Sequence, residues 1–257
     1  MRIVMYSTLR GLMVGLLLCL PSPGIAAPAE KVVLQLKWFH QFQFAGYYAA
    51  TARGYYADEG LEVELRPLKS GITVVEQVVS GAANYGIGDS GIIADYARGA
   101  PIVALAAIFQ HDPLVFVSKS KSGIISPYEM VGKRLMFDAR GSDDGPLRAM
   151  LAESGLTPDK FMHVPHTYDK EDLASDKVDV MSAYLTDQPF HFRQRGIPVN
   201  IINPQSYGLD FYGDLLFTSE EELRANPGRA ERFVRASLRG WQYALDHPEE
   251  MIKLINR

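Results

Sequence analysis

The chain has 257 residues, a formal net charge of −4, 47% hydrophobic residues and a single cysteine. This composition excludes a disordered chain, a collagen-like repeat, a disulfide-stapled miniprotein and a strongly basic nucleic-acid-binding protein. A globular protein with one or two ordinary hydrophobic cores remains, and we expect no nucleic-acid partner.

Residues 1–29 predict a cleaved secretory signal peptide. Arg2 and Arg10 precede an apolar run over residues 11–20, and small residues follow up to Ala29. The run is too short to span a bilayer, although an uncleaved membrane anchor is an alternative interpretation. Cleavage after Ala29 would remove the only cysteine, Cys19. We therefore expect a periplasmic protein without a disulfide, a thiolate nucleophile or a cysteine metal ligand.

The first part of the mature chain alternates between strand and helix patterns. Strands are predicted at residues 31–37, 61–67, 84–87, 102–109 and 114–117, and helices at residues 45–53, 72–80 and 90–98. The continuously apolar run at 102–109 is typical of a strand buried on both faces. This order predicts an α/β fold with a mostly parallel sheet and helices on both faces.

The same alternation then starts again. Strands are predicted at residues 134–138, 162–164, 178–183, 199–202 and 212–218, and helices at residues 126–131, 146–154, 188–194, 220–225, 227–246 and from 248 onwards. Two similar halves predict two lobes with a double crossover and a ligand cleft between them. We assign residues 30–117 and 205–257 to lobe 1 and residues 118–204 to lobe 2. Helical apolar spacing continues to the last residue, which predicts either a truncated segment of lobe 1 or a fraying helix.

Loops that follow strands should line the cleft, and the first of them is rich in aromatic residues. Over residues 38–48, a flat ligand could stack on Trp38, while His40 and Gln43 offer donors and acceptors in the ring plane. The other aromatic residues of the loop are interpreted as core or hinge packing. Trp38, His40 and Gln43 are therefore candidate ligand-binding residues.

The second loop, residues 85–91, contains Gly86, Gly88 and Gly91 in a G-x-G-x-x-G spacing. This spacing is typical of dinucleotide binding, but the preceding strand is short, polar at its start and not the first of its sheet. Alternatively, Asp89 or Ser90 caps a helix and the glycines allow close backbone packing. We expect the cap to face the cleft, which makes Asp89 and Ser90 candidate ligand-binding residues.

Two further loops precede helices in the second half of the chain. Around residues 138–146, the acidic pair Asp143 and Asp144 lies where a helix amino terminus would otherwise attract an anion, which favours a neutral or hydrogen-bond-donating ligand. In the loop at 184–189, carboxylate and amide oxygens could accept hydrogen bonds from ring or amino N–H groups. Simple helix capping is an equally open interpretation for both loops. The candidates from these loops are Gly141, Ser142, Tyr184, Asp187 and Gln188.

Catalytic and metal-binding patterns are weak. The six histidines form no H-E-x-x-H motif, and no nucleophile triad or carboxylate pair can be assigned from spacing. We expect no catalytic residues, no metal site and no cofactor.

Several short motifs carry a resemblance to a known family. They are Leu36-Lys-Trp38, Gly46-Tyr-Tyr-x-Ala50, Gly54-Tyr-Tyr-Ala-Asp-Glu-Gly-Leu-Glu-Val63 and Gly99-Ala-Pro101. From about residue 31 onwards the chain resembles the thiamine-pyrimidine synthase-like family, which is related to periplasmic binding proteins for taurine, alkanesulfonates and nitrate. The resemblance implies a type II periplasmic-binding-protein fold and a small-molecule ligand. It also implies a partner, either an ABC transporter permease or a downstream membrane signalling module.

The chain departs from the fungal synthases of that family. Those enzymes carry a cysteine-rich iron motif near what is here 209–213, where no cysteine stands, and the family's Asn-Glu-Pro appears as Asp187-Gln188-Pro189. We therefore predict an exported solute-binding protein that closes on a small, flat, nitrogenous ligand such as a thiamine-precursor pyrimidine, for ABC-type uptake or as a sensor input domain. The hypothesis is that Trp38 stacks on the ligand and that Ser90, Ser142 and Asp187 hydrogen-bond to it. The alternative is a thiamine pyrimidine synthase.

Overall fold

The structure is a computed structural model that describes residues 28–69, 71–138 and 144–256. The predicted signal peptide lies almost entirely outside these ranges. Within them, no helix combines the length and the hydropathy that a membrane crossing requires.

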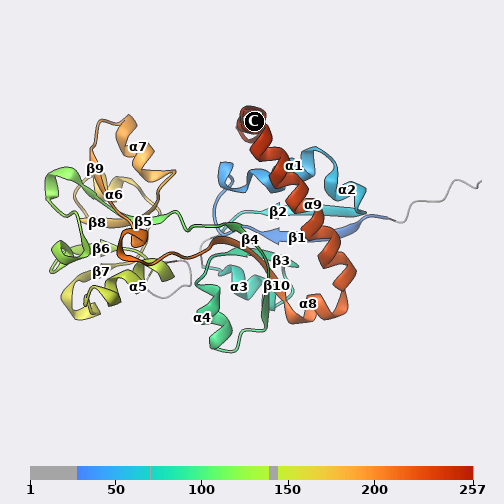
Figure 1. The fold of residues 1–257 in the computed structure, drawn as a ribbon, viewed down its shortest axis with the longest axis horizontal. Helices are drawn as coiled ribbons and strands as arrows, with labels where there is room; N and C mark the ends of the chain where they lie inside the picture. The colour runs from blue at the N-terminus through green and yellow to red at the C-terminus, as the bar shows by residue number, and fades with distance from the viewer. Residues whose placement is uncertain (1–27, 70, 139–143, 257) are drawn as a thin grey trace, which may run out of the picture.

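Two lobes lie side by side, each built on its own five-stranded sheet (Figure 1). The sheet of the first lobe has the order β2-β1-β3-β10-β4, with β1 at Glu30–Gln35, β2 at Leu61–Arg66, β3 at Tyr85–Gly88, β4 at Ile102–Phe109 and β10 at Gly213–Ser219. The sheet of the second lobe has the order β7-β6-β8-β5-β9, with β5 at Leu114–Lys119, β6 at Arg134–Met136, β7 at Met162–Val164, β8 at Val180–Tyr184 and β9 at Val199–Ile202.

Helices cover both faces of each sheet, as predicted. The first lobe contains α1 at Ala45–Ala52, α2 at Tyr55–Asp58, α3 at Val74–Val79, α4 at Ile92–Ala97, α8 at Glu220–Ala225, α9 at Pro227–Asp246 and α10 at Pro248–Ile255. The second contains α5 at Gly145–Glu153, α6 at Glu171–Ala174 and α7 at Gln188–Gln194. Short 3-10 turns include η1 at Phe42–Phe44, η3 at Pro127–Met130 and η5 at Pro204–Tyr207.

Alternating side chains of the central strands fill separate cores on the two faces. In β10, Leu216 packs in the cluster that contains Phe233 of α9, whereas Phe217 packs in the cluster that contains Val74 of α3. In β5, Phe116 shares a cluster with α5. Strands with both faces covered in this way carry the continuous apolar runs seen in the sequence.

The predicted mostly parallel arrangement is confirmed in both sheets, with one antiparallel strand as an exception in each. β10 pairs antiparallel with β3 and β4, and β5 pairs antiparallel with β8 and β9. These two strands enter their sheets directly from the other lobe and therefore run against their neighbours. Hydrophobic runs indicate burial on both faces but contain no information about strand direction.

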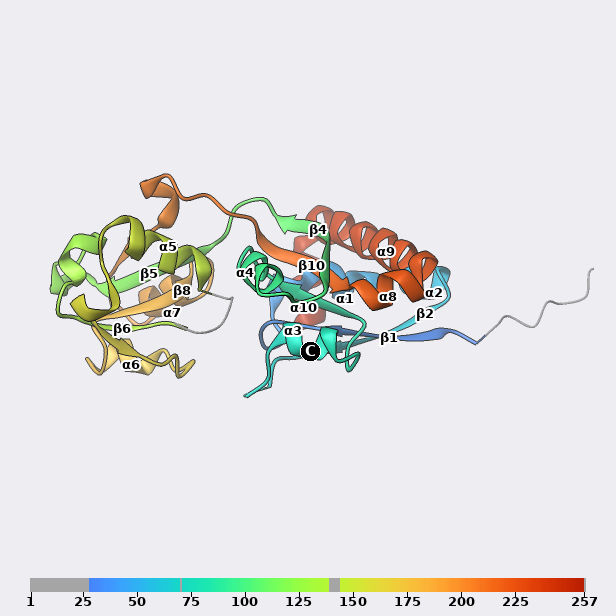
Figure 2. The same ribbon diagram turned by 90° about the horizontal axis from the view of Figure 1, so that it is seen from below.

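The chain passes between the lobes twice, through residues 110–113 and 208–212 (Figure 2). The predicted limit between residues 117 and 118 falls inside β5, which belongs to the second sheet. Beyond the predicted limit at residue 204, Tyr207 and Leu209 still pack against the core of the second lobe. The Asp112 N–H donates to the Phe211 carbonyl at 2.8 Å, so the two linkers lie side by side.

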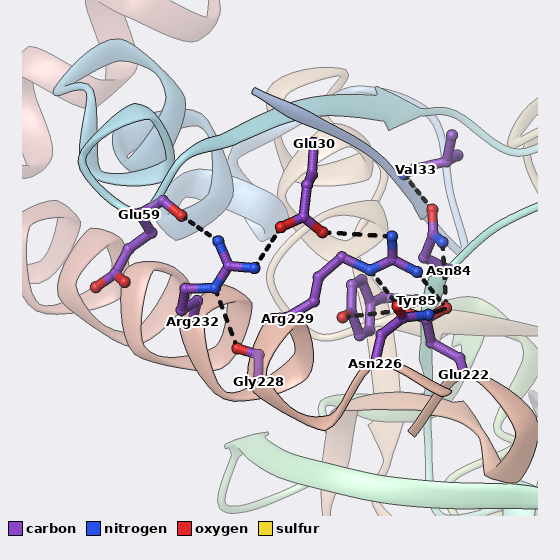
Figure 3. Close-up of polar contacts among 10 residues, drawn as sticks. All are labelled: Glu30, Val33, Glu59, Asn84, Tyr85, Glu222, Asn226, Gly228, Arg229 and Arg232. Carbon is purple, nitrogen blue, oxygen red and sulfur yellow. Dashed lines mark hydrogen bonds and ion pairs between the residues drawn. The ribbon is translucent and has the colours of Figure 1, made fainter. Parts of the chain in front are cut away.

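A polar network fastens the last helices to the first strand (Figure 3). Glu222 of α8 accepts two hydrogen bonds from Arg229 of α9, at 2.8 and 2.6 Å. Arg229 and Arg232 both pair with Glu30 at the start of β1. Within the first lobe, the network therefore joins Arg232 to Glu30, which are 202 positions apart in the chain.

Helices α1 and α9 pack unusually closely because each has a glycine at the contact. A β-carbon built on Gly240 would lie 2.1 Å from the Gly46 carbonyl oxygen and 2.7 Å from the Ala50 β-carbon. A β-carbon on Gly46 would meet the Trp241 ring at 2.2 Å. The contact leaves no space for a methyl group on either helix.

We expect Gly240→Ala to lower the free energy of unfolding by about 1–3 kcal/mol, because the helices must move apart. Chemical and thermal unfolding would measure the loss. The matched control is Gly228→Ala in the same helix, where a β-carbon meets nothing within 4 Å, so its stability should be unchanged or slightly raised. Equal effects at both positions would contradict the close-packing explanation.

Candidate ligand-binding site between the lobes

A pocket lies between the two lobes and takes its walls from both. From the first lobe it is lined by Lys37, Trp38, Gln41 and Gln43, which follow β1. From the second lobe it is lined by Leu114, Asp138, Asp144, His166, Tyr168, Ser182, Ala183, Tyr184, Asp187 and Gln188. These second-lobe residues come from several strand ends and from the loops that follow them, where open α/β sheets bind ligands.

Aromatic rings from opposite lobes meet in this pocket. The ring centroids of Trp38 and Tyr168 are 5.0 Å apart, with an interplanar angle of 69°. Tyr168 has a φ of 63°, a left-handed backbone conformation that non-glycine residues adopt rarely. On its other side, the Tyr168 ring lies 4.7 Å from that of His166. The two lobes therefore each contribute an aromatic surface to the same pocket.

A buried ionic cluster lies behind the aromatic pair. The Lys37 ammonium lies 3.1 Å from the Asp89 carboxylate and 3.7 Å from that of Asp214. Asp214 also accepts hydrogen bonds from Gln43 at 3.0 Å and from the Tyr184 hydroxyl at 3.3 Å. The Tyr184 contact crosses from the second lobe to the first, and the Lys37 ammonium lies 5.5 Å from the centre of the Tyr184 ring.

Burial dominates the titration of this cluster. It raises the pKa of Asp89 to about 6, since nearby Lys37 only partly offsets the loss of water and nearby Asp112 adds repulsion. Burial likewise raises the pKa of Asp214 and of the Tyr184 phenol, with Lys37 acting in the opposite direction on both. Burial lowers the pKa of His166 and so favours its neutral form.

The wall formed by the second lobe is also polar. The carboxylate of Asp187 accepts from the Lys170 ammonium at 2.6 Å, and that of Asp144 accepts from the Asp138 N–H. The Gln188 side-chain oxygen accepts from the Tyr184 N–H at 2.7 Å. These bonds fix three side chains at the pocket edge. Among the described residues, no three side chains of metal-ligating type gather closely enough to hold an ion.

The structure brings together some of the candidates from the sequence and separates others. Trp38, Gln43, Tyr184, Asp187 and Gln188 all line the pocket. Gly141 and Ser142 lie outside the described residues. The other candidates are not among the lining residues: they are His40, Asp89 and Ser90.

Each of these three side chains has a different neighbour. His40 contacts the Tyr48 hydroxyl at 2.7 Å on the exposed side of the loop. Asp89 is the buried partner of Lys37. Ser90 donates its hydroxyl hydrogen to the Tyr212 carbonyl at 2.6 Å, so it contacts one of the two interlobe linkers.

The glycine-rich loop agrees with the close-packing interpretation of the sequence and not with a dinucleotide-binding turn. Helix α4 begins at Ile92 with Gly91 as its N-cap, and the Asp89 carboxylate accepts a hydrogen bond from the Gly91 N–H at 2.7 Å. Gly86 and Gly88 belong to the buried strand β3, where added β-carbons would lie 2.8 and 3.3 Å from the Phe217 ring. The glycines therefore allow close packing against β10 and are not part of a phosphate-binding turn.

Sequence reasoning did not select Lys37, Asp214, His166 or Tyr168. Two of them have a signal that could have been found: Lys37 closely follows the strand β1, and Asp214 lies near the start of the buried strand β10. Charged residues are rarely buried unless they are paired, so two such residues of opposite sign indicate a buried ion pair.

We expect the stability difference between the wild type and Asp89→Asn to depend on pH. Because its pKa of about 6 lies above the unfolded value near 3.8, folded Asp89 holds its proton at a higher pH than the unfolded chain does. Its contribution to stability is therefore largest at low pH and is lost as the pH rises from about 4 to about 7.

The free energy of unfolding of the wild type, relative to Asp89→Asn, should thus fall by up to about 3 kcal/mol over that range. Urea unfolding at a series of pH values would measure it. The control Asp58→Asn replaces an exposed carboxylate, so its curve corrects for effects of the substitution that are not specific to the buried site. A relative stability of the wild type that rises with pH would contradict the burial explanation and favour dominance by Lys37.

Several curated proteins are similar to this chain over most of its length. The "Riboflavin-binding protein RibY" of Chloroflexus aurantiacus is 28% identical over 91% of this chain and 68% of its own length. A "Formylaminopyrimidine-binding protein" of Halalkalibacterium halodurans is 21% identical over 88% of the chain and 70% of its own length. A "4-amino-5-hydroxymethyl-2-methylpyrimidine phosphate synthase" of Legionella pneumophila is 22% identical over 88% of this chain and 73% of its own length.

Solved structures show the same fold. The periplasmic aliphatic sulphonate binding protein of Escherichia coli superimposes with a TM-score of 0.69 at 14% identity, over 88% of this chain and 77% of its own. The predicted type II periplasmic-binding-protein fold with two lobes is thereby confirmed. Residues 41–251 match the family described as "NMT1/THI5 like", which confirms the resemblance found in the sequence. The chain belongs to the NMT1/THI5-like family.

Proposed function

We propose that this protein is an exported solute-binding protein whose two lobes close on a small, flat, nitrogenous ligand. The observation that carries the proposal is the pair of rings from opposite lobes, Trp38 and Tyr168, beside the polar group formed by Lys37, Gln43 and Tyr184. Aromatic faces bind flat rings by stacking, and the polar groups fix the orientation of the ring.

The names of the relatives support a nitrogen heterocycle as the ligand. One relative is named for riboflavin and another for formylaminopyrimidine. Both compounds contain flat nitrogen-containing rings with donors and acceptors at their edges, which match a stacking residue flanked by amides. Riboflavin and formylaminopyrimidine are therefore the first ligands to test, followed by other thiamine-precursor pyrimidines.

Ligand binding would replace contacts that now cross the pocket. A ring stacked on Trp38 takes the position of the edge-to-face contact with Tyr168, and its polar edge can bond to Gln188 and Asp187 of the second lobe. Ser90 would affect closure of the lobes through its hydrogen bond to Tyr212 in the second linker. The linkers at residues 110–113 and 208–212 are the segments about which the lobes would turn.

The proposed cellular role is delivery of the ligand to an ABC transporter permease from the periplasm. The signal-peptide pattern and the fold shared with a periplasmic sulphonate-binding protein support it. A sensor input domain of the same fold is the other role that the sequence suggests. Activation of a permease ATPase by the loaded protein would support transport.

We expect Trp38→Ala to weaken ligand binding at least about tenfold, because loss of a stacking ring costs about 1.4 kcal/mol or more. Calorimetry against riboflavin, formylaminopyrimidine, thiamine, amino acids and taurine would identify the ligand and measure the loss. Trp38→Phe, which keeps an aromatic face, should retain most of the affinity.

Tyr55→Phe provides a control away from the pocket, since that ring packs against Tyr243 in the first lobe. If Trp38→Ala bound the ligand as tightly as the wild type, the stacking assignment would be wrong. If no nitrogenous ring compound bound at all, the proposed function would fail.

The synthase named among the relatives is the competing function. It predicts formation of a pyrimidine product and a pyridoxal Schiff-base absorbance in the purified protein. Appearance of that absorbance with product formation would replace the binding proposal. Reversible binding of an unaltered ligand would support it.

A further inference from the structure

We infer that Tyr184 is a latch between the lobes: its hydroxyl holds them together by donating a hydrogen bond to Asp214, and it adds to ligand affinity through this closure. The inference rests on the proposed function in taking closure of the lobes as the event that traps a ligand. It adds the contact that sets how readily the lobes close before a ligand arrives, so its main test needs no ligand.

The latch joins one residue of each sheet. Tyr184 ends β8 in the second lobe, and Asp214 is the second residue of β10 in the first. The Tyr184 hydroxyl donates to the Asp214 carboxylate at 3.3 Å. Hydrogen bonds to an ionised carboxylate are about twice as strong as those between neutral groups. This contact therefore favours the arrangement of the lobes that the structure shows.

Both partners of the latch lie next to the linkers. Tyr184 pairs with Leu114, the residue with which β5 begins after the linker at 110–113. The next residue, Leu185, donates its N–H to the Pro113 carbonyl of that linker at 2.8 Å. Asp214 follows the linker at 208–212 by two residues. A turn of the lobes about these linkers changes the distance between the two partners, and a hydrogen bond tolerates only a small change in distance.

The acceptor is fixed on the first lobe. The Gln43 side-chain nitrogen donates to both carboxylate oxygens of Asp214 at 3.0 Å, and the Gln41 side-chain nitrogen donates to the Gln43 oxygen at 2.6 Å. Asp214 is only 1% exposed. Both glutamines belong to the same lobe as Asp214, so these bonds do not depend on the position of the second lobe. The bond from Tyr184 is the one that separation of the lobes would break.

Two further contacts bring the lobes together without polar side chains. At the start of α5, a β-carbon built on Gly145 would lie 3.4 Å from the α-carbon of Gly91, the N-cap of α4. The rings of Trp38 and Tyr168 meet at 5.0 Å, and a ligand stacked on Trp38 would replace that contact. The hydrogen bond of the latch is directional and involves neither ring, so it can hold the lobes both before and after a ligand enters.

The test measures the distance between the lobes in the absence of ligand. In a Cys19→Ser background, which carries no other cysteine, Ser80→Cys and Ser175→Cys provide one exposed labelling site in each lobe. Double electron–electron resonance between two spin labels then gives the distribution of distances. Gly145→Leu supplies the reference for separated lobes, because its side chain would collide with Gly91 in the arrangement of the structure.

We expect the unliganded wild type to populate the distance of the structure. Tyr184→Phe should lower the ratio of closed to open lobes about tenfold and move the distribution towards that of Gly145→Leu, because phenylalanine keeps the ring and loses only the hydrogen bond. Tyr128→Phe, at an exposed tyrosine of the same lobe, should leave the ratio unchanged. An unchanged distribution in Tyr184→Phe, or a wild type that matches Gly145→Leu, would overturn the inference.

A binding measurement separates a latch from a direct ligand contact. Tyr184→Phe should bind riboflavin or formylaminopyrimidine up to about tenfold more weakly than the wild type, and saturating ligand should restore the closed distance. A loss of affinity without any change in the ligand-free distances would assign the hydroxyl to ligand contact and refute the latch. If neither compound bound the wild type, the proposed function would lose its support, whereas the ligand-free distances would still decide the role of Tyr184.

Discussion

The ion cluster around Lys37 is the constraint on which the arrangement of the lobes depends. Lys37 follows β1, Asp89 follows β3 and Asp214 lies in β10, the strand by which the chain returns from the second lobe. Burying a lysine is unfavourable unless carboxylates accompany it, so β1 can keep Lys37 inside only when the return strand is in place. Tyr184 extends the cluster into the second lobe.

The backbone at Asp214, one of the carboxylates in this cluster, has an unusual conformation. Asp214 has a φ of 37°, which is unusual for a residue other than glycine, and the preceding Gly213 lies close to the linker at Asp112 and Pro113. Positions of this kind persist where surrounding contacts determine them, and they are concentrated at functional sites. The two linkers, the cluster and the pocket therefore form one connected region, and closure of the lobes would act on all three together.

The aromatic and the polar parts of the pocket wall come from different elements. The rings of Trp38 and Tyr168 form the aromatic part of the pocket wall, whereas its polar groups come mainly from the second lobe. The fold is shared with a sulphonate-binding protein, but the loops at the strand ends and not the sheets determine which ligand a protein of this architecture binds.

The sequence by itself determined the alternation of strands and helices, the two-lobed α/β fold, the family and the aromatic character of the first loop, because burial periodicity and local motifs are properties of neighbouring residues. Only the tertiary structure decided the antiparallel direction of β5 and β10, the pairing of Lys37 with Asp89 and Asp214, and the meeting of Trp38 with Tyr168. Asp89 illustrates the difference: its position after a strand suggested a bond to the start of the next helix, and its carboxylate does accept from the Gly91 N–H. The same carboxylate also pairs with a lysine that precedes it by 52 residues, which no local pattern indicated. Such pairings depend on where the chain crosses between lobes, and no local pattern records that path.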